Sequence, residues 1–163
     1  MLKKINTDRY KGVKKIGIDS SLNLLPKNTQ NISFIDYDLR DEFLFTNASI
    51  ISSVFTLQFL PQSKRFAIIK NIYQGLIKGG AFFFCEKIYS SYAKIQDMFT
   101  FNYYDFKAKT FSAEEILNKE KSLRYLMQPC THEENISMLK EAGFNIFDIF
   151  IKHFNFEGIV AIK

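Results

Sequence analysis

The sequence has few of the residues that build flexible linkers, disulfide frameworks or metal centres. Among its 163 residues are only 3 Pro, 7 Gly and 2 Cys. The two cysteines, Cys85 and Cys130, are too few for a disulfide framework and lack a CxxC spacing, so we expect a reducing compartment and no metal site. The apolar runs are far shorter than the roughly 18 residues that span a bilayer, and the basic N-terminal segment has no apolar signal region. The sequence therefore predicts a cytoplasmic protein without a membrane partner.

Apolar and aromatic side chains, in contrast, are abundant. Hydrophobic residues make up 47% of the chain and charged residues 24%, with 18 Phe and 8 Tyr. This composition predicts one globular domain, 1–163, with a sizeable core. The net charge of +5 fits an anionic partner such as RNA, but Lys and Arg are spread along the chain rather than clustered. Direct nucleic-acid binding is therefore not required by the composition.

Short apolar runs bounded by polar clusters predict six strands. They cover residues 15–18, 32–35, 50–54, 81–85, 146–150 and 159–162. Apolar residues at helical spacing predict helices over 63–77 and 92–106. In the first of these helices Ser63 is the expected N-cap, and Gly79 lies just past the expected end.

Two capping-box patterns predict two further helices. Ser112 and Glu115 form the first pattern, Thr131 and Glu134 form the second, and the second helix closes at Gly143. Strands alternate with helices at first, and the last two strands follow each other across a short loop. The fold class is therefore α/β, with an antiparallel hairpin at the C-terminal end of the sheet.

Two of the predicted strands run into acidic residues that suit a nucleoside. In doubly wound folds a carboxylate at the tip of the second strand accepts both ribose hydroxyls, because its lone pairs match a vicinal diol. Asp19 is the candidate for this role, and the alternative is that it only caps the following turn. After the next strand, the Asp38 carboxylate and the backbone N–H of Leu39 are candidates to hold an adenine edge.

For two segments near the ends of later strands, the sequence does not decide between a ligand-binding role and a structural one. The loop 54–61 follows a strand, where such folds bind ligands, but a run this apolar is more often core. Cys85 is expected to be a small buried hydrophobe. Glu86 and Lys87 either face the ligand crevice or pair at the surface.

The remaining candidates for a site carry weaker signals. The two glycines that precede Asp19 are isolated, so no glycine-rich turn that lets a ligand approach the backbone comes before it. His132 and His153 have no Ser, Cys or carboxylate at a spacing typical of a catalytic triad. We expect both histidines to be structural or at the surface.

The order of these segments resembles the carboxy-S-adenosyl-L-methionine synthase family, from about Lys14 to the end of the chain. The blocks FTLQFL, IYQGL and FNF, at 55–60, 72–76 and 154–156, are specific to that family. The IGIDSS and GGA pieces occur across class I S-adenosylmethionine (SAM) methyltransferases generally. The resemblance implies the class I SAM-methyltransferase fold, a Rossmann-like sheet of seven strands with a reversed last strand.

The resemblance also implies an activity and a set of ligands. Family members are homodimers that convert SAM and prephenate into carboxy-SAM, which a partner enzyme uses to carboxymethylate hydroxyuridine at the tRNA wobble position. The bound cofactor is then SAM, carboxy-SAM or S-adenosylhomocysteine, and carbon transfer at its sulfonium needs no protein nucleophile. Asp19 and Ser20 match the family's ribose-contacting pair, and Asp38 and Leu39 match its adenine-contacting pair.

The chain departs from the family pattern in three respects. The family's first strand and glycine-containing turn have no counterpart, which implies an N-terminally truncated domain. Val54 stands where the family has an Asn at the cofactor. Glu120 stands where the family has an Arg that pairs with the transferred carboxylate, so an attraction becomes a repulsion. Arg124, one helical turn further, or Lys121 is a candidate to replace that Arg.

Three functions are compatible with these features. The first is a SAM-dependent transferase in tRNA wobble-uridine modification. The second is a non-catalytic remnant of the fold that serves as a binding or dimerisation module, and the third is a plain SAM methyltransferase acting on another substrate. Because the central strand is missing, we expect strands 14–18 and 50–54 to pair directly, which narrows the crevice for the methionine portion of SAM and leaves SAM affinity weak or absent.

Overall fold

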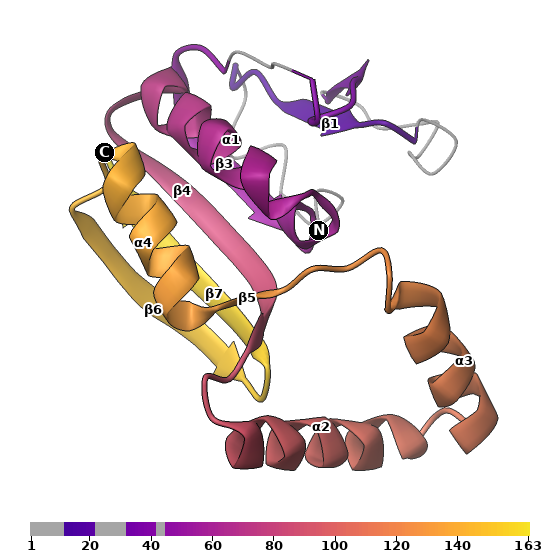
Figure 1. The fold of residues 1–163 in the computed structure, drawn as a ribbon. Helices are drawn as coiled ribbons and strands as arrows, with labels where there is room; N and C mark the ends of the chain where they lie inside the picture. Colours follow the sequence, from indigo (N-terminus) through magenta and orange to yellow (C-terminus); the bar gives the residue numbers. More distant parts are fainter. Residues whose placement is uncertain (1–11, 22–31, 42–44) are drawn as a thin grey trace. The chain divides into compact units, whose positions relative to one another are not determined.

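The chain divides into two compact units, Met1–Phe43 and Leu44–Lys163. The computed structural model describes residues 12–21, 32–41 and 45–163 (Figure 1). The prediction of a single domain is not tested by this division and stays a prediction.

The first unit contains a parallel pair of short strands, β1 (Ile16–Asp19) and β2 (Ser33–Asp36). The register runs from Ile16 opposite Ser33 to Asp19 opposite Asp36. Both predicted strands are therefore confirmed, each shifted by about one residue. Their carboxyl ends lie at the same edge, where Asp19 and Asp36 face each other across the pair.

The second unit is built on a five-stranded sheet with the order β3-β4-β7-β6, in which β5 also pairs with β4. β3 and β5 run parallel to β4, whereas β7 runs antiparallel to both β4 and β6. The predicted C-terminal hairpin is therefore confirmed (Figure 1). The strands are β3 (Ala48–Val54), β4 (Leu76–Tyr89), β5 (Cys130–Thr131), β6 (Ile146–His153) and β7 (Phe156–Ile162).

Helix α1 (Gln62–Gly75) precedes β4, and its predicted ends are wrong. Pro61, not Ser63, is the N-cap, and no side chain caps this end. The helix stops at Gly75, and β4 starts at once, so Gly79 lies within a strand at φ 77° and its N–H donates to the carbonyl of Lys163 at 2.8 Å. Pairing with the C-terminal strand thus replaces the expected loop.

The buried core of the second unit lies between the sheet and two helices. α1 and α4 (His132–Ala142) lie on the same face of the sheet (Figure 1) and contact each other. Removing this apolar area from water is the main stabilising contribution to the unit. The largest of its fully buried side chains are Leu57, Ile69, Leu76, Phe82, Leu139, Phe144 and Ile159.

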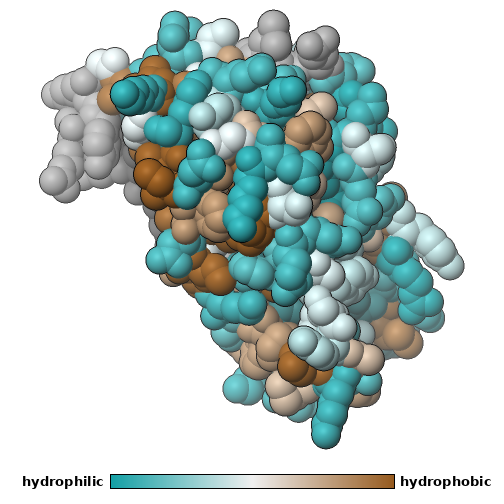
Figure 2. Space-filling view, turned by 60° about the vertical axis from the view of Figure 1, so that its left-hand side comes forward, coloured by the Kyte–Doolittle hydropathy of each residue, from teal (hydrophilic) through white to brown (hydrophobic). Residues whose placement is uncertain are grey.

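Helices α2 (Ala93–Ala108) and α3 (Ala113–Leu123) follow the end of β4 and lie away from this core (Figure 1). No residue of α2 is fully buried, and Ile116 is the buried residue of α3. The capping boxes predicted at Ser112 and Thr131 are both formed, and Gly143 ends α4 at φ 117° as expected. Hydrophobic residues are interspersed with hydrophilic ones on the face seen in Figure 2.

Candidate functional site

Asp19, the candidate for ribose binding, lies exposed at the carboxyl end of β1. Its Oδ1 accepts the N–H of Ser21 at 2.8 Å, so the carboxylate does cap the following turn. A carboxylate has about four acceptor positions on its two oxygens, and one bond to a backbone N–H leaves acceptors for hydroxyl groups. The two interpretations of Asp19 are therefore compatible, and the exposed carboxylate fits a ribose diol.

Asp38 has a different environment in the same unit. Both of its carboxylate oxygens accept hydrogen bonds from the Arg40 guanidinium, and Oδ1 also accepts the Arg40 backbone N–H at 2.9 Å. These hydrogen bonds and the charge of Arg40 lower the pKa of Asp38 to about 2. An adenine amino group would therefore have to share a carboxylate that Arg40 already engages, and the fit of Asp38 to adenine is poorer than that of Asp19 to ribose.

In the second unit, a buried carboxylate accepts hydrogen bonds from the backbone of the loop after β3. Glu86, on β4, accepts the backbone N–H groups of Thr56 at 3.3 Å, Leu57 at 3.1 Å and Gln58 at 2.6 Å. These residues lead into the short 3₁₀ helix η4 (Leu57–Phe59), whose first N–H groups have no partner within the helix. Glu86 therefore faces this loop on the interior side of the sheet.

Burial raises the pKa of Glu86 to about 7, although its three N–H donors and the charge of Arg65 act in the opposite direction. Arg65 is itself buried and donates to the carbonyls of Leu60, Gln58 and Gln128. Its Nη1 also lies 2.9 Å from Cys130 Sγ. The loop is thus hydrogen-bonded on one side to Glu86 of β4 and on the other to Arg65 of α1.

Val54 ends β3 directly before this loop and is half-buried, opposite Cys85 of β4. Cys85 is half-buried, and burial raises the pKa of its thiol, as expected for a small apolar residue. Phe55 adopts φ 53°, a left-handed conformation that is uncommon for a bulky residue, and its N–H donates to the Cys85 carbonyl at 2.8 Å. The backbone therefore turns sharply where the family pattern expects a cofactor contact.

Glu120, expected to face a transferred carboxylate, pairs with a lysine. Its Oε1 lies 2.8 Å from Lys107 Nζ, and the two side chains are 24% and 14% exposed. Their charges also act on Lys87: burial lowers the pKa of Lys87, the charge of Glu120 raises it, and the charge of Lys107 lowers it. Arg124 is exposed at the C-terminal end of α3, where its N–H donates to the Glu120 carbonyl at 3.0 Å.

Aromatic rings surround this charged cluster. Lys107 Nζ lies 4.4 Å from the centre of the Tyr103 ring and 5.0 Å from that of Tyr104. The Tyr103 ring packs on Phe156 at 5.1 Å, and Phe156 packs on Phe55 at 5.6 Å. Neither Lys107 nor Tyr103 was predicted as a site residue, although their spacing of four residues on one helix indicates that they share a face.

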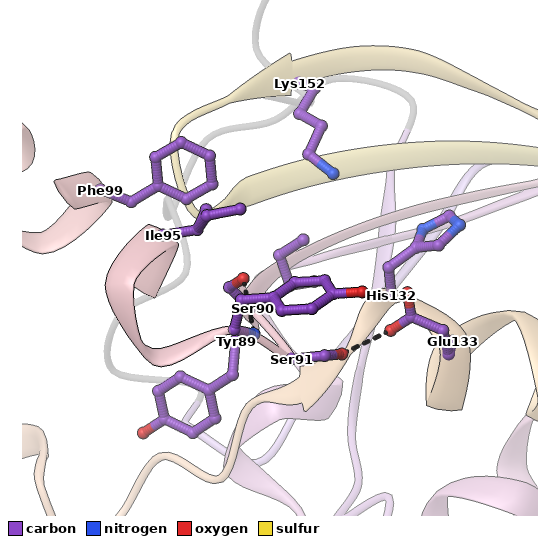
Figure 3. Close-up of a pocket in the computed structure, with 10 residues that line it drawn as sticks. Tyr89, Ser90, Ser91, Ile95, Phe99, His132, Glu133 and Lys152 are labelled. Atoms are coloured by element: carbon purple, nitrogen blue, oxygen red, sulfur yellow. Dashed lines mark hydrogen bonds between the residues drawn. The ribbon is translucent and has the colours of Figure 1, made fainter. Parts of the chain in front are cut away.

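A cavity of about 260 Å³ lies at the carboxyl ends of β4 and β6. In Figure 3, Lys152 and His132 are among the side chains that line it, and Ser91 Oγ donates to Glu133 at 3.1 Å. His132 Nδ1 lies 2.8 Å from the buried Glu157, which also accepts from Lys152 Nζ at 3.1 Å. This buried carboxylate accounts for the position of His132, which we predicted to be structural or at the surface.

The part of the chain that the structure describes holds neither a metal centre nor a membrane-spanning helix. Across residues 12–21, 32–41 and 45–163, no group of three or more His, Cys, Asp or Glu side chains could hold a metal ion. Within the same ranges, no helix is long and apolar enough to cross a membrane.

Solved structures similar to this chain show its fold. Human N-acetylserotonin methyltransferase, solved in complex with SAM, matches with a TM-score of 0.62 and 17% identity over 96% of this chain and 42% of that one. The protein PigF, solved with S-adenosylhomocysteine, matches with a TM-score of 0.62 and 18% identity over 96% of this chain and 45% of that one. The chain thus has the Rossmann-like fold of class I SAM-dependent methyltransferases.

Sequence relatives identify the family, although no protein-family model matches the chain. The carboxy-S-adenosyl-L-methionine synthase of Staphylococcus epidermidis is 39% identical over the whole of this chain, which spans 74% of that protein. The synthase of Trichodesmium erythraeum is 33% identical over 91% of this chain and 62% of its own length. The chain belongs to the carboxy-S-adenosyl-L-methionine synthase family.

Proposed function

We propose that this chain is a SAM-dependent transferase that forms carboxy-SAM from SAM and prephenate and so supplies tRNA wobble-uridine modification. The observation that carries the proposal is the 39% identity with a carboxy-S-adenosyl-L-methionine synthase along the full chain. A cytoplasmic location and a homodimer belong to the same proposal.

Within this proposal, Asp19 and Ser20 hold the ribose of SAM, and Asp38 and Leu39 hold its adenine. When bound, SAM would supply a sulfonium-bound methyl group that loses one proton and gains a carboxyl group as CO2. Prephenate would give up that carboxyl group and its ring hydroxyl as its ring becomes aromatic, and the proton and the hydroxyl would leave as water. The chain's own residues bind and orient the reactants, since no protein nucleophile is required. The loop after Val54, fastened by Glu86, gives that part of the chain a fixed backbone.

Calorimetric titration of the full chain with SAM and with S-adenosylhomocysteine tests the binding part. We expect weak binding, which Asp19→Asn weakens by about a further tenfold through the loss of one good charge-assisted hydrogen bond. Asp36→Asn is the matched control, because Asp36 ends the neighbouring strand. No heat at millimolar ligand would favour a non-catalytic binding module instead.

Mass spectrometry of an incubation with SAM and prephenate tests the reaction part. Carboxy-SAM is the expected product. SAM binding without carboxy-SAM, together with methyl transfer to another acceptor, would favour a plain methyltransferase.

A further inference from the structure

Lys107 and Glu120 form an ion pair whose charges act on Lys87 of β4, which lies opposite Phe156 in the sheet. Lys107 forms an ion pair with Glu120 that is largely shielded from water, with side chains 14% and 24% exposed. Lys87 lies in the same electrostatic neighbourhood, where burial and Lys107 lower its pKa and Glu120 raises it. With both lysines protonated, the three groups carry a net charge of one positive unit.

Neighbouring acids do not remove this imbalance. Glu86 precedes Lys87 on the strand, and successive side chains of a strand point to opposite faces. Glu86 is also buried and engaged by the N–H groups of Leu57 and Gln58. Since an ammonium group taken from water is costly unless it is paired, a second anion near Lys87 and Lys107 would be stabilised.

The surroundings of the cluster suit a flat apolar group. Tyr103, Phe156 and Phe55 form a continuous row of edge-to-face contacts that begins at Lys107. Phe55 is 44% exposed, so the end of this row is accessible. Aromatic rings favour offset or edge-on packing with other unsaturated rings. Charge and shape together describe a small carboxylic acid that carries a ring.

We propose that Lys87 and Lys107 bind the carboxylate of a small ring-bearing acid, and that Glu120 is an internal counter-ion which this carboxylate displaces from Lys107. The inference rests on the proposed function in taking the acid to be the carboxyl donor. Glu120 then sets the strength and the selectivity of binding, because only an anion that replaces its attraction to both lysines enters the site.

Calorimetric titration of the full chain with prephenate, in the absence of SAM, tests this assignment. Glu120→Gln keeps the size of the side chain and removes the competing charge, so we expect prephenate to bind about tenfold more tightly. Lys107→Gln and Lys87→Gln should each weaken binding by about tenfold, and Lys107→Arg should retain it. Glu114→Gln and Lys109→Gln change the net charge in the same way at exposed positions and should have no effect.

Malonate, a carboxylate without a ring, is the second probe. It should respond to Glu120→Gln as prephenate does but bind more weakly, and Phe55→Ala should reduce this difference. The proposal is overturned if Glu120→Gln binds prephenate no more tightly than the unchanged chain does. It is also overturned if Glu114→Gln tightens prephenate binding as much as Glu120→Gln does. Because Glu120→Gln is expected to gain affinity, misfolding cannot imitate the expected result.

The outcomes separate this inference from the proposed function. If no carboxy-SAM forms but Glu120→Gln tightens binding of both probes, the anion site stands and the proposed reaction fails. If carboxy-SAM forms and the KM for prephenate is the same in Glu120→Gln and Lys107→Gln as in the unchanged chain, the anion site fails and the proposed reaction stands.

Discussion

Glu86 is the residue whose ionisation matters most for the stability of the second unit. Burial raises its pKa to about 7 from an ordinary value of 4.5. Because the folded pKa lies above the unfolded one, the protonated form stabilises the fold fully below about pH 4.5. This contribution is lost as the pH rises towards 7 and stays lost above it.

The first prediction follows from this shift. The free energy of unfolding should fall between pH 5 and 7 by up to about 3 kcal/mol, as the unfolded chain ionises more readily than the folded one. In Glu86→Gln this part of the pH dependence should be absent. Urea unfolding at a series of pH values measures both, with the exposed Glu114→Gln as control. Equal pH profiles for Glu86→Gln and the unchanged chain would contradict the assignment.

Arg65 gives a second prediction at the residue scale. It is 2% exposed and donates to carbonyls that belong to the η4 loop and to the segment before β5. Arg65→Met keeps much of the apolar stem but leaves these acceptors unpaired and Glu86 without its nearby cation. We expect a loss of about 3 kcal/mol or more in the free energy of unfolding. Arg124→Met, at an exposed position, should change it little; a similar loss in both would show that Arg65 has no special role.

At the scale of elements, the two capping boxes have unequal consequences. Thr131 caps α4, which buries Leu139 and Ala142 in the core, whereas Ser112 caps α3, which buries only Ile116 among the residues described. Both caps make the same kinds of hydrogen bond, but of the two helices only α4 packs against α1, which covers the sheet. Loss of the α4 cap is therefore transmitted to global stability.

This difference is the third prediction. Thr131→Ala should lower the free energy of global unfolding by about 1 kcal/mol. Ser112→Ala should mainly increase the fraying of α3, visible as faster amide hydrogen exchange within that helix and little change in the urea midpoint. Equal shifts of the midpoint in the two variants would show that α3 unfolds together with the core.

The positions of the elements could be predicted from the sequence better than their ends. The apolar runs located β3, β4, β6 and β7 but not the two-residue β5, and the side-chain caps located α3 and α4. β4 is far longer than the run 81–85, because pairing with β7 continues as far as Lys87 opposite Phe156, beyond the apolar residues. α1 has no side-chain cap to mark its start, which is why Ser63 was the wrong choice.

The candidate site shows the same limit. Asp19 could be located because its signal is local, a carboxylate at the end of a strand. The pairing of Glu120 with Lys107 depends on how α2 and α3 pack together, and no local pattern in the sequence contains that information. The engagement of Asp38 by Arg40 is local, two residues apart, but depends on a turn conformation that composition does not specify.

At the scale of the whole molecule, the hydrophobic core and the residues proposed to bind the nucleoside belong to different units. The fully buried side chains, such as Phe82, Phe144 and Ile159, are in the second unit. Asp19 and Asp38 are in the first, whose described strands are four residues each. A sheet of two short strands is at best marginally stable in water, so the nucleoside candidates need support beyond β1 and β2.

The hydrogen-bond register of β1 indicates where that support must bind. The N–H groups of Ser33 and Tyr37 donate to the carbonyls of Lys15 and Asp19, so these alternate positions of the β1 segment face β2. The backbone groups of Ile16 and Ile18 then point to the opposite edge of the pair, since alternate residues of a strand present their polar groups to opposite sides. An edge of this kind is a template for another strand.

The fourth prediction is that a further strand pairs with that edge of β1. In the full chain, the amides of Ile16 and Ile18 should then be protected from hydrogen exchange to a degree comparable with that of Phe83 on the central strand β4. Addition of SAM should not be needed for this protection, because backbone pairing rather than ligand contact supplies it. Rapid exchange of both amides in the monomer would exclude a partner strand from the same chain, and protection that appears only as the chain concentration rises would assign the partner strand to a second copy.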